Sequence, residues 1–424
     1  MAFFRLNADV YVVRGESGAA IYDISRRCVL RIDTVTADAI DATVGKGDVS
    51  QLTDPGMRSA IDGLVAARLG RLYEKSVYVD PYRPAVHLVA PGLMEPTTAL
   101  RLLYLQPTAE CGFSCDGCGE VDSSVWQGCG SCARWPDVRK NARWPDDTWR
   151  SVLEDIHGLM IGRIVVSGGD VANLASLRLW LRQLRSSMPT TDLVVSTTAG
   201  GASESSLLEL HEIGAGINFV FPTRRAEYEA FTGSKTAFAQ ATESLLLAER
   251  LGIRWTITAP PECPDEVLAE CFGPTVAKRF VARVLLASHP SRRPNDLRHL
   301  RQGRRARVAQ TSSADYFANR EVARCLNRSA AIDAEGHLRP CPMIPFARGS
   351  TAHGTKSLRH AITQRLLEKH WYMTKDFIPA CGSCEFRYGC VDCVATDLTQ
   401  RTSPRHSASV CGYDSRTGTW DLGE

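Results

Sequence analysis

The sequence lacks the features typical of membrane, secreted and nucleic-acid-binding proteins. It has no run of eighteen or so apolar residues, so we expect no membrane span. The N-terminus lacks a charged start followed by an apolar core and a small-residue cleavage site, which argues against secretion. The charge is nearly balanced, with 50 Lys and Arg against 47 Asp and Glu, which is too even to indicate nucleic-acid binding. We therefore expect a cytoplasmic protein that binds neither membrane nor nucleic acid.

Cysteine, in contrast, is abundant and clustered. Fifteen cysteines occur in 424 residues, most of them between 111 and 132 and between 381 and 411. A reducing compartment disfavours disulfides, so metal binding explains this pattern better. The length predicts two or three domains, each able to bury its own core.

The first cluster is Cys111, Cys115 and Cys118, in a C-x3-C-x2-C spacing just after an apolar run. Three thiolates on one loop can each bind one iron of a [4Fe-4S] cube and leave the fourth iron open to a small molecule. The alternative is zinc, because Cys115 and Cys118 are followed by Cys129 and Cys132, and two C-x2-C pairs are typical of a zinc ribbon. Cys111 would be idle in a zinc site, which favours the cluster.

From residue 98 onward, strand-like and helix-like runs alternate, which predicts an α/β fold with a parallel sheet and helices outside it. Helices are expected at about 146–160 and 236–251. The expected strands are 102–105, 161–167, 192–198, 217–221, 255–258 and 281–286. Active sites in such folds lie at the carboxyl ends of strands. The cysteine loop, Gly168 and Ser196 all fall at such ends, which predicts a single site.

The cysteine spacing at a strand end resembles the radical S-adenosylmethionine superfamily, and Gly168-Gly169-Asp170 is similar to its Gly-Gly-Glu turn. This resemblance implies a partial (β/α)6 TIM-like barrel over 97–290. It implies that the catalytic cysteines 111, 115 and 118 hold a cluster that splits S-adenosylmethionine into methionine and a 5'-deoxyadenosyl radical. The contacts with S-adenosylmethionine that it implies are Phe113, Cys115, Gly168, Gly169, Asp170, Ser196 and Thr198.

The C-terminal third, residues 311–424, resembles the SPASM extension, which holds two auxiliary [4Fe-4S] clusters. The resemblance implies that the outer cluster is bound by Cys381, Cys384, Cys390 and Cys411. It implies that the inner cluster is bound by Cys325, Cys341 and Cys393. The fourth iron of this cluster is then open, or is bound by substrate, Cys129 or Cys132. Two zinc sites are the alternative for these thiols.

Residues 1–82 are expected to form a small separate unit. Strands are expected at 10–14, 19–24, 28–32 and 72–78, with helices at 36–44 and from Asp54 or Pro55 onward. The order resembles the winged-helix element with which enzymes that modify ribosomally made peptides bind a leader peptide by strand addition. The alternative is a structural cap on the catalytic domain.

Taken over nearly the whole chain, the motifs resemble the grasp-with-SPASM peptide maturases, most clearly from Cys384 to Cys393 and at Cys411 to Trp420. The resemblance implies an oxidoreductase with three [4Fe-4S] clusters. It would take a hydrogen atom from a residue of a precursor peptide that carries a leader, giving a thioether, C–C or C–O cross-link or another oxidation. Flavodoxin or ferredoxin would supply electrons. A sulfatase-maturase-like or small-molecule radical oxidase, and a zinc-ribbon binding protein that is no enzyme, remain alternatives.

Overall fold

The structure is a computed structural model. The chain forms two compact units. The structure describes residues 1–44, 47–85, 99–115, 118, 132, 135, 137–198, 200–220, 225–259, 281–283, 305–306, 308–344, 357–390 and 411–421. The terminal unit combines Met1–Met94, Pro294–Arg324 and Met373–Glu424, and the sheet unit combines Glu95–Arg293 with Cys325–Tyr372. The division into domains at 1–82, 97–290 and 311–424 stays a prediction.

The sheet unit is built on one sheet with the order β11-β10-β9-β8-β7-β6-β12-β13. All neighbours are parallel except β13, which is antiparallel to β12. The strands are β6 (Ala99–Leu105), β7 (Met160–Val166), β8 (Asp192–Ser196), β9 (Gly216–Val220), β10 (Trp255–Ala259), β11 (Val281–Arg283), β12 (Ser329–Ile332) and β13 (Leu338–Arg339). The α/β class is confirmed, and the sheet is open, because no ladder within the described ranges joins β11 to β13.

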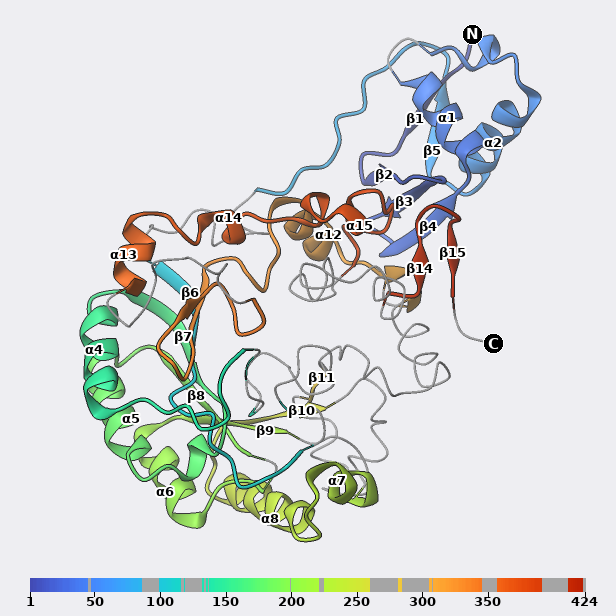
Figure 1. Cartoon of the computed structure of the whole chain (residues 1–424). Helices are drawn as coiled ribbons and strands as arrows, with labels where there is room; N and C mark the ends of the chain where they lie inside the picture. The colour runs from blue at the N-terminus through green and yellow to red at the C-terminus, as the bar shows by residue number, and fades with distance from the viewer. Residues whose placement is uncertain are drawn as a thin grey trace. The chain divides into compact units, whose positions relative to one another are not determined.

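Helices line the outer side of this sheet (Figure 1). They are α4 (Asp146–Ile156), α5 (Leu177–Ser187), α6 (Glu204–Ile213), α7 (Arg225–Thr232), α8 (Ala237–Arg250), α13 (Ser357–Thr363) and α14 (Glu368–Trp371). The core lies between sheet and helices, where Trp149 of α4 stacks on Trp180 of α5 with ring centroids 4.7 Å apart. The helix expected to reach residue 160 ends at Ile156, because Gly158 adopts a positive φ of 76° that breaks it.

A C-terminal segment completes the sheet. β12 pairs in parallel with β6, with Ser329 opposite Leu102. The indole N–H of Trp371 donates to the Ser329 carbonyl oxygen at 2.7 Å and fixes this strand from outside. The turn expected at Glu335-Gly336 does connect β12 to β13. Residues 325–344 thus extend the sheet of the preceding domain.

In the terminal unit, β2 (Val10–Arg14), β3 (Ala19–Asp23) and β4 (Cys28–Ile32) form an antiparallel sheet with β3 in the centre. Two helices, α1 (Thr34–Thr43) and α2 (Pro55–Ala66), follow at the expected positions. The expected closing strand is β5 (Gly70–Tyr73), but it pairs with β1 (Phe3–Leu6) in a separate two-stranded sheet. The winged-helix arrangement therefore stays a prediction.

Both faces of the central strand β3 are covered. Ile21 packs in a cluster with the helices α1 and α2, whereas Ala20 and Tyr22 face an aromatic cluster that includes Tyr316 and Phe386. This second cluster brings together α12 (Ser313–Glu321), the turns of residues 384–390, β14 (Tyr413–Asp414) and β15 (Thr419–Trp420). The short elements η6 (Lys375–Phe377) and α15 (Pro379–Gly382) precede those turns. The N-terminal sheet and the cysteine-rich C-terminus therefore share one core.

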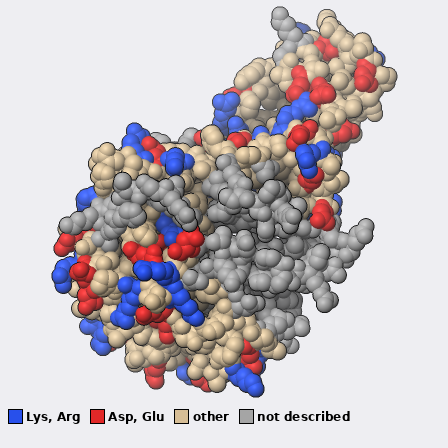
Figure 2. Space-filling model, in the orientation of Figure 1, with Lys and Arg blue, Asp and Glu red and all other residues tan. Residues whose placement is uncertain are grey.

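Acidic and basic side chains intermingle on the described surface that Figure 2 shows, as the balanced composition predicts. Ion pairs between neighbouring helices contribute to this pattern, for example Arg182 of α5 with Glu212 of α6 at 2.8 Å. Within the described ranges, no helix combines the length and the apolar character that crossing a membrane requires.

Candidate functional site

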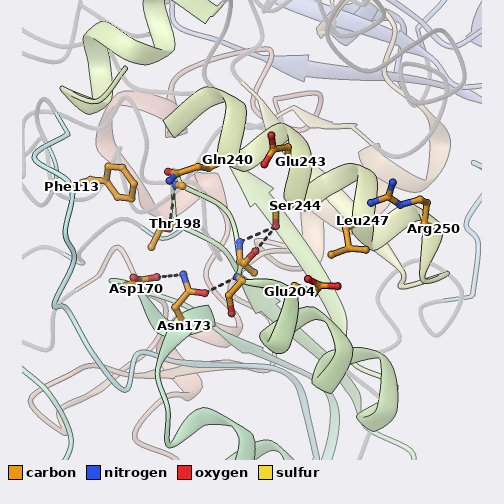
Figure 3. Close-up of a pocket in the computed structure, with 13 residues that line it drawn as sticks. Phe113, Asp170, Asn173, Thr198, Glu204, Gln240, Glu243, Ser244, Leu247 and Arg250 are labelled. Carbon is orange, nitrogen blue, oxygen red and sulfur yellow. Dashed lines mark hydrogen bonds between the residues drawn. The ribbon is translucent and has the colours of Figure 1, made fainter. Parts of the chain in front are cut away.

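A cavity of about 640 Å³ lies where three strand ends of the sheet unit meet (Figure 3). Phe113 reaches it from the loop after β6, Asp170 from the turn after β7, and Thr198 from the end of β8. The remaining lining comes from the 3-10 turn η4 (Val171–Asn173), the start of α6 and one side of α8: Asn173, Gly200, Ala202, Ser203, Glu204, Gln240, Glu243, Ser244, Leu247 and Arg250. The structure thus brings together residues that the sequence placed at separate strand ends.

The Gly168-Gly169 turn lies in close contact with the start of the cysteine loop. Both glycines have positive φ, 88° and 51°, which other residues rarely adopt. A Cβ on Gly169 would collide with the carbonyl oxygen of Glu110, the residue before Cys111, and a Cβ on Gly168 would collide with Gln106. The N–H of Asp170 also donates to that Glu110 oxygen at 2.7 Å. Glycine is therefore required for the two loops to lie this close.

Asp170 is held in place through Asn173. The Asn173 side-chain amide donates to Asp170 Oδ1 at 2.8 Å, and its oxygen accepts from the Ser203 N–H, also at 2.8 Å. Burial raises the pKa of the Asp170 carboxyl above its ordinary value, although the Asn173 bond opposes this. This arrangement points one carboxyl group at the cavity, where it can accept a hydrogen bond from a cationic ligand.

The end of β8 forms a tight turn beside Phe113. Thr198 Oγ1 accepts a hydrogen bond from the Gly200 N–H at 3.3 Å. The same hydroxyl donates to the Gly201 carbonyl oxygen, also at 3.3 Å. A Cβ on Gly200 would approach the Phe113 ring to 2.6 Å, so the ring packs directly on this glycine. Ser196 is fully buried within β8 and does not line the cavity. Thr198 is thus the better placed of the two predicted hydroxyls.

The three cysteines of the first loop lie close to one another. Burial raises the pKa of the Cys115 thiol to about 12, and neighbouring Cys118 and Cys111 add to the shift. Burial likewise raises the pKa of Cys111, whereas the Phe113 N–H, which donates to its sulfur at 3.5 Å, opposes the rise. The pKa of Cys132 is raised by burial and by the same three thiols, which places it beside them. Cys129 lies outside the described residues.

Thiolates are the usual donors for a [4Fe-4S] cube and are also common zinc ligands. Within the described part of the chain, no group of three or more His, Cys, Asp or Glu side chains converges closely enough to hold one ion. Zinc needs four ligands at about 2.0–2.3 Å from one centre. A [4Fe-4S] cube takes each thiolate on a different iron, so its ligands stand farther apart.

The predicted outer cluster ligands belong to the terminal unit. Burial raises the pKa of Cys384, and nearby Cys390 and Cys411 raise it further, so these three thiols are neighbours. The Cys384 N–H donates to the Cys381 carbonyl oxygen at 2.9 Å, which closes a turn between these two ligands. The donor chemistry again suits a cluster.

The predicted inner cluster ligands are described only in part. Cys325 is exposed and Cys341 is buried, and both belong to the sheet unit. Cys393 lies outside the described residues.

Sequence reasoning missed several lining residues. Asn173 follows Asp170 by three positions, a spacing that indicates a short turn with linked side chains. Gln240, Ser244 and Leu247 recur at i, i+4 and i+7 on α8, which marks one helix face. Nothing in the sequence shows that this face borders a cavity instead of the core.

No protein-family model matches the chain, and no curated protein matches it. Among solved structures, it is similar to Streptococcus suis SuiB bound to the precursor peptide SuiA, with a TM-score of 0.47, 14% identity, and coverage of 97% of this chain and 100% of SuiB. It is also similar to anSMEcpe with bound AdoMet, with a TM-score of 0.48, 12% identity, and coverage of 69% of this chain and 88% of anSMEcpe. Both similarities are at low sequence identity.

Proposed function

We propose that this chain is a radical S-adenosylmethionine enzyme with a SPASM extension that modifies a ribosomally made precursor peptide. One observation carries the proposal: the Cys111 loop, the Gly168-Gly169-Asp170 turn and the end of β8 surround one cavity at the carboxyl edge of a parallel sheet. Cys111, Cys115 and Cys118 would hold a [4Fe-4S] cluster, and S-adenosylmethionine would occupy the cavity. When bound, such a cluster supplies the electron that splits S-adenosylmethionine reductively.

The residues of the cavity would bind and orient S-adenosylmethionine. Gly168 and Gly169 leave the backbone open for close approach, and the Asp170 carboxylate would accept a hydrogen bond from the methionine ammonium group. The Phe113 ring packs on Gly200 and closes one wall, which would exclude water from the reacting atoms.

The C-terminal cysteines would hold the two auxiliary clusters. Cys381, Cys384, Cys390 and Cys411 would bind the outer one, and Cys325, Cys341 and Cys393 the inner one. These clusters would accept the second electron of the oxidation or bind a substrate thiolate, so that a cross-link or another oxidised residue forms. Flavodoxin or ferredoxin would supply the first electron in the cytoplasm.

The N-terminal sheet would bind the leader of the precursor peptide. Because β3 is already paired with β2 on one side and β4 on the other, strand addition to this sheet would use the outer edge of β2 or of β4. Part of the β4 edge is already taken, since the Val29 N–H donates to the Ala309 carbonyl oxygen at 3.0 Å.

The proposal is tested by incubating the anaerobically reconstituted, reduced protein with S-adenosylmethionine and measuring 5'-deoxyadenosine. Wild type and a control, Cys28→Ala, should form it, because Cys28 lies in β4 of the terminal unit, outside the predicted ligand sets. The triple variant C111A/C115A/C118A should form none. An iron-loaded wild type that forms no 5'-deoxyadenosine would argue against the proposal.

One observation favours a second candidate, a zinc-binding protein: the three loop cysteines raise the pKa of Cys132, so a fourth thiol lies near them. This candidate predicts colourless protein that contains zinc. Cys132→Ala should then lower zinc content, whereas the cluster proposal expects the first cluster to survive this change.

A further inference from the structure

We propose that Ser244 is a positioning residue: from α8 it holds the loop of residues 200–203 in the place where the Phe113 ring packs on it and closes the cavity (Figure 3). The Ser244 hydroxyl accepts from the Ala202 N–H at 2.9 Å and donates to the Ala202 carbonyl oxygen at 3.0 Å. The inference rests on the proposed function, because it takes S-adenosylmethionine as the ligand of this cavity.

The hydroxyl of Ser244 joins parts of the chain that are distant in sequence. A hydroxyl within a helix can bond a carbonyl oxygen one turn earlier, as Thr242 of α8 does with Phe238 at 2.8 Å. Ser244 instead bonds a residue 42 positions earlier, and only 5% of Ser244 is exposed. This buried hydroxyl thus serves both main-chain groups of Ala202, much as a neighbouring strand would.

The loop also lies directly against α8. Gly201 has a positive φ of 78°, and a Cβ there would come within 2.7 Å of the Ser244 Cβ. On the other side, the Asn173 amide group donates to the Gly201 carbonyl oxygen at 3.4 Å, and its oxygen accepts from the Ser203 N–H at 2.8 Å. Side chains of α8 and of the turn after β7 therefore anchor the loop from two sides.

The position of this loop determines where the Phe113 ring lies. A Cβ on Gly200 would approach the ring to 2.6 Å, so the ring and the loop are in direct contact. If Ala202 moved away from Ser244, the ring would lose part of the surface on which it packs. Both main-chain groups of Ala202 and the Gly201 N–H are bonded within the protein, so the loop contributes shape more than hydrogen bonds to a ligand.

The test is isothermal titration calorimetry of S-adenosylmethionine into the full-length, reconstituted chain without oxygen. Ser244→Ala removes both bonds to Ala202 and should weaken binding by about tenfold. The matched control is Ser329→Ala. Ser329 is also buried in the sheet unit, with its hydroxyl 2.8 Å from the Pro340 carbonyl oxygen, but it does not line the cavity. S329A should lower thermal stability as S244A does, yet bind S-adenosylmethionine like wild type.

A double variant tests whether Ser244 acts through Phe113. Phe113→Leu replaces the ring by a smaller side chain and should itself weaken binding. Adding S244A to F113L should then weaken binding by much less than about tenfold, because the ring that Ser244 positions is already gone. The same loss in both backgrounds would show that Ser244 acts by another route and would overturn the proposal.

Failure of this role and failure of the proposed function give different results. If wild type binds S-adenosylmethionine and S244A binds it equally well, the role of Ser244 is overturned and the proposed function stands. If iron-loaded wild type binds none, the proposed function fails, and the role of Ser244 fails with it. If S244A does not fold, Ser244→Cys, which keeps a weak donor, should show a smaller loss of affinity. Wild-type affinity in S244C would then overturn the role.

Discussion

The Tyr22 hydroxyl donates a hydrogen bond to the main-chain oxygen of Glu385, at 3.0 Å and across 363 positions of sequence. The same hydroxyl accepts from the Gly389 N–H at 3.2 Å. Both partners lie in the segment between Cys384 and Cys390. The N-terminal sheet therefore holds the loop that carries two proposed ligands of the outer cluster.

Tyr22→Phe should weaken this connection. The variant removes the hydroxyl that donates to the Glu385 carbonyl oxygen and accepts from the Gly389 N–H. The Gly389 N–H keeps its bond to the Phe386 carbonyl oxygen at 3.0 Å, so we expect a loss of about 1 kcal/mol in stability. Chemical denaturation measures this difference, and iron lost from the outer site should accompany it. Tyr78→Phe changes a tyrosine that is 83% exposed and should leave stability unchanged. Equal stability of both variants would contradict a holding role for Tyr22.

Arg31 and Glu385 make the second connection between sheet and loop. The Glu385 side chain is fully buried and accepts from Arg31 Nε at 3.0 Å and from the Tyr413 hydroxyl. Arg31→Met should lower the free energy of unfolding by about 2 kcal/mol. This loss is smaller than for breaking a fully buried ion pair, because the Arg31 side chain is 32% exposed. Adding Glu385→Gln should recover part of this loss in thermal unfolding, since it removes the unpaired charge. A double variant no more stable than R31M would argue against the charge explanation.

These contacts mark the limit of prediction from the sequence. The apolar runs predicted the strands of the parallel sheet and the positions of α1 and α2, because their patterns are local. The pairing of β12 with β6 joins residues more than two hundred positions apart, and Ser329–Ile332 reads from sequence only as one arm of a hairpin. β1 was missed because Phe3–Leu6 is short and gains its partner only from β5.

Gly169→Ala should specifically weaken binding of S-adenosylmethionine. The added methyl group would collide with the Glu110 carbonyl oxygen and push the turn away from the cysteine loop, so we expect at least about a tenfold loss in affinity. Gly158→Ala is the matched control, because Gly158 also has a positive φ, of 76°, but no atom lies within 4 Å of the added Cβ. It should cost about 1 kcal/mol of stability and leave affinity unchanged. Isothermal titration calorimetry compares the two, and equal affinities would contradict the account of the turn.

Asp170 should make binding of S-adenosylmethionine depend on pH. Burial raises the pKa of this carboxyl group, and only its ionised form attracts the methionine ammonium. Affinity should therefore fall as the pH drops from neutral toward the raised pKa, because protonation removes the negative charge. Asp170→Asn should bind weakly at neutral pH and lose this acid-side dependence, whereas Glu154→Gln on the exposed side of α4 should behave as wild type. An unchanged pH profile in D170N would show that another group titrates.

The candidate site could be predicted only in part. The cysteine spacing, the two glycines and Asp170 could be found because each follows a recognisable strand. The α8 residues Gln240 and Ser244 could not, since only the folded chain places them beside the others.

The most direct test of the account is the iron, sulfide and zinc content of the chain after purification and reconstitution without oxygen. Three four-iron cubes predict about twelve irons per chain, and C111A/C115A/C118A should lose about four of them. Zinc with little iron, in wild type and variant alike, would contradict the radical-enzyme account and indicate a protein stabilised by structural metal.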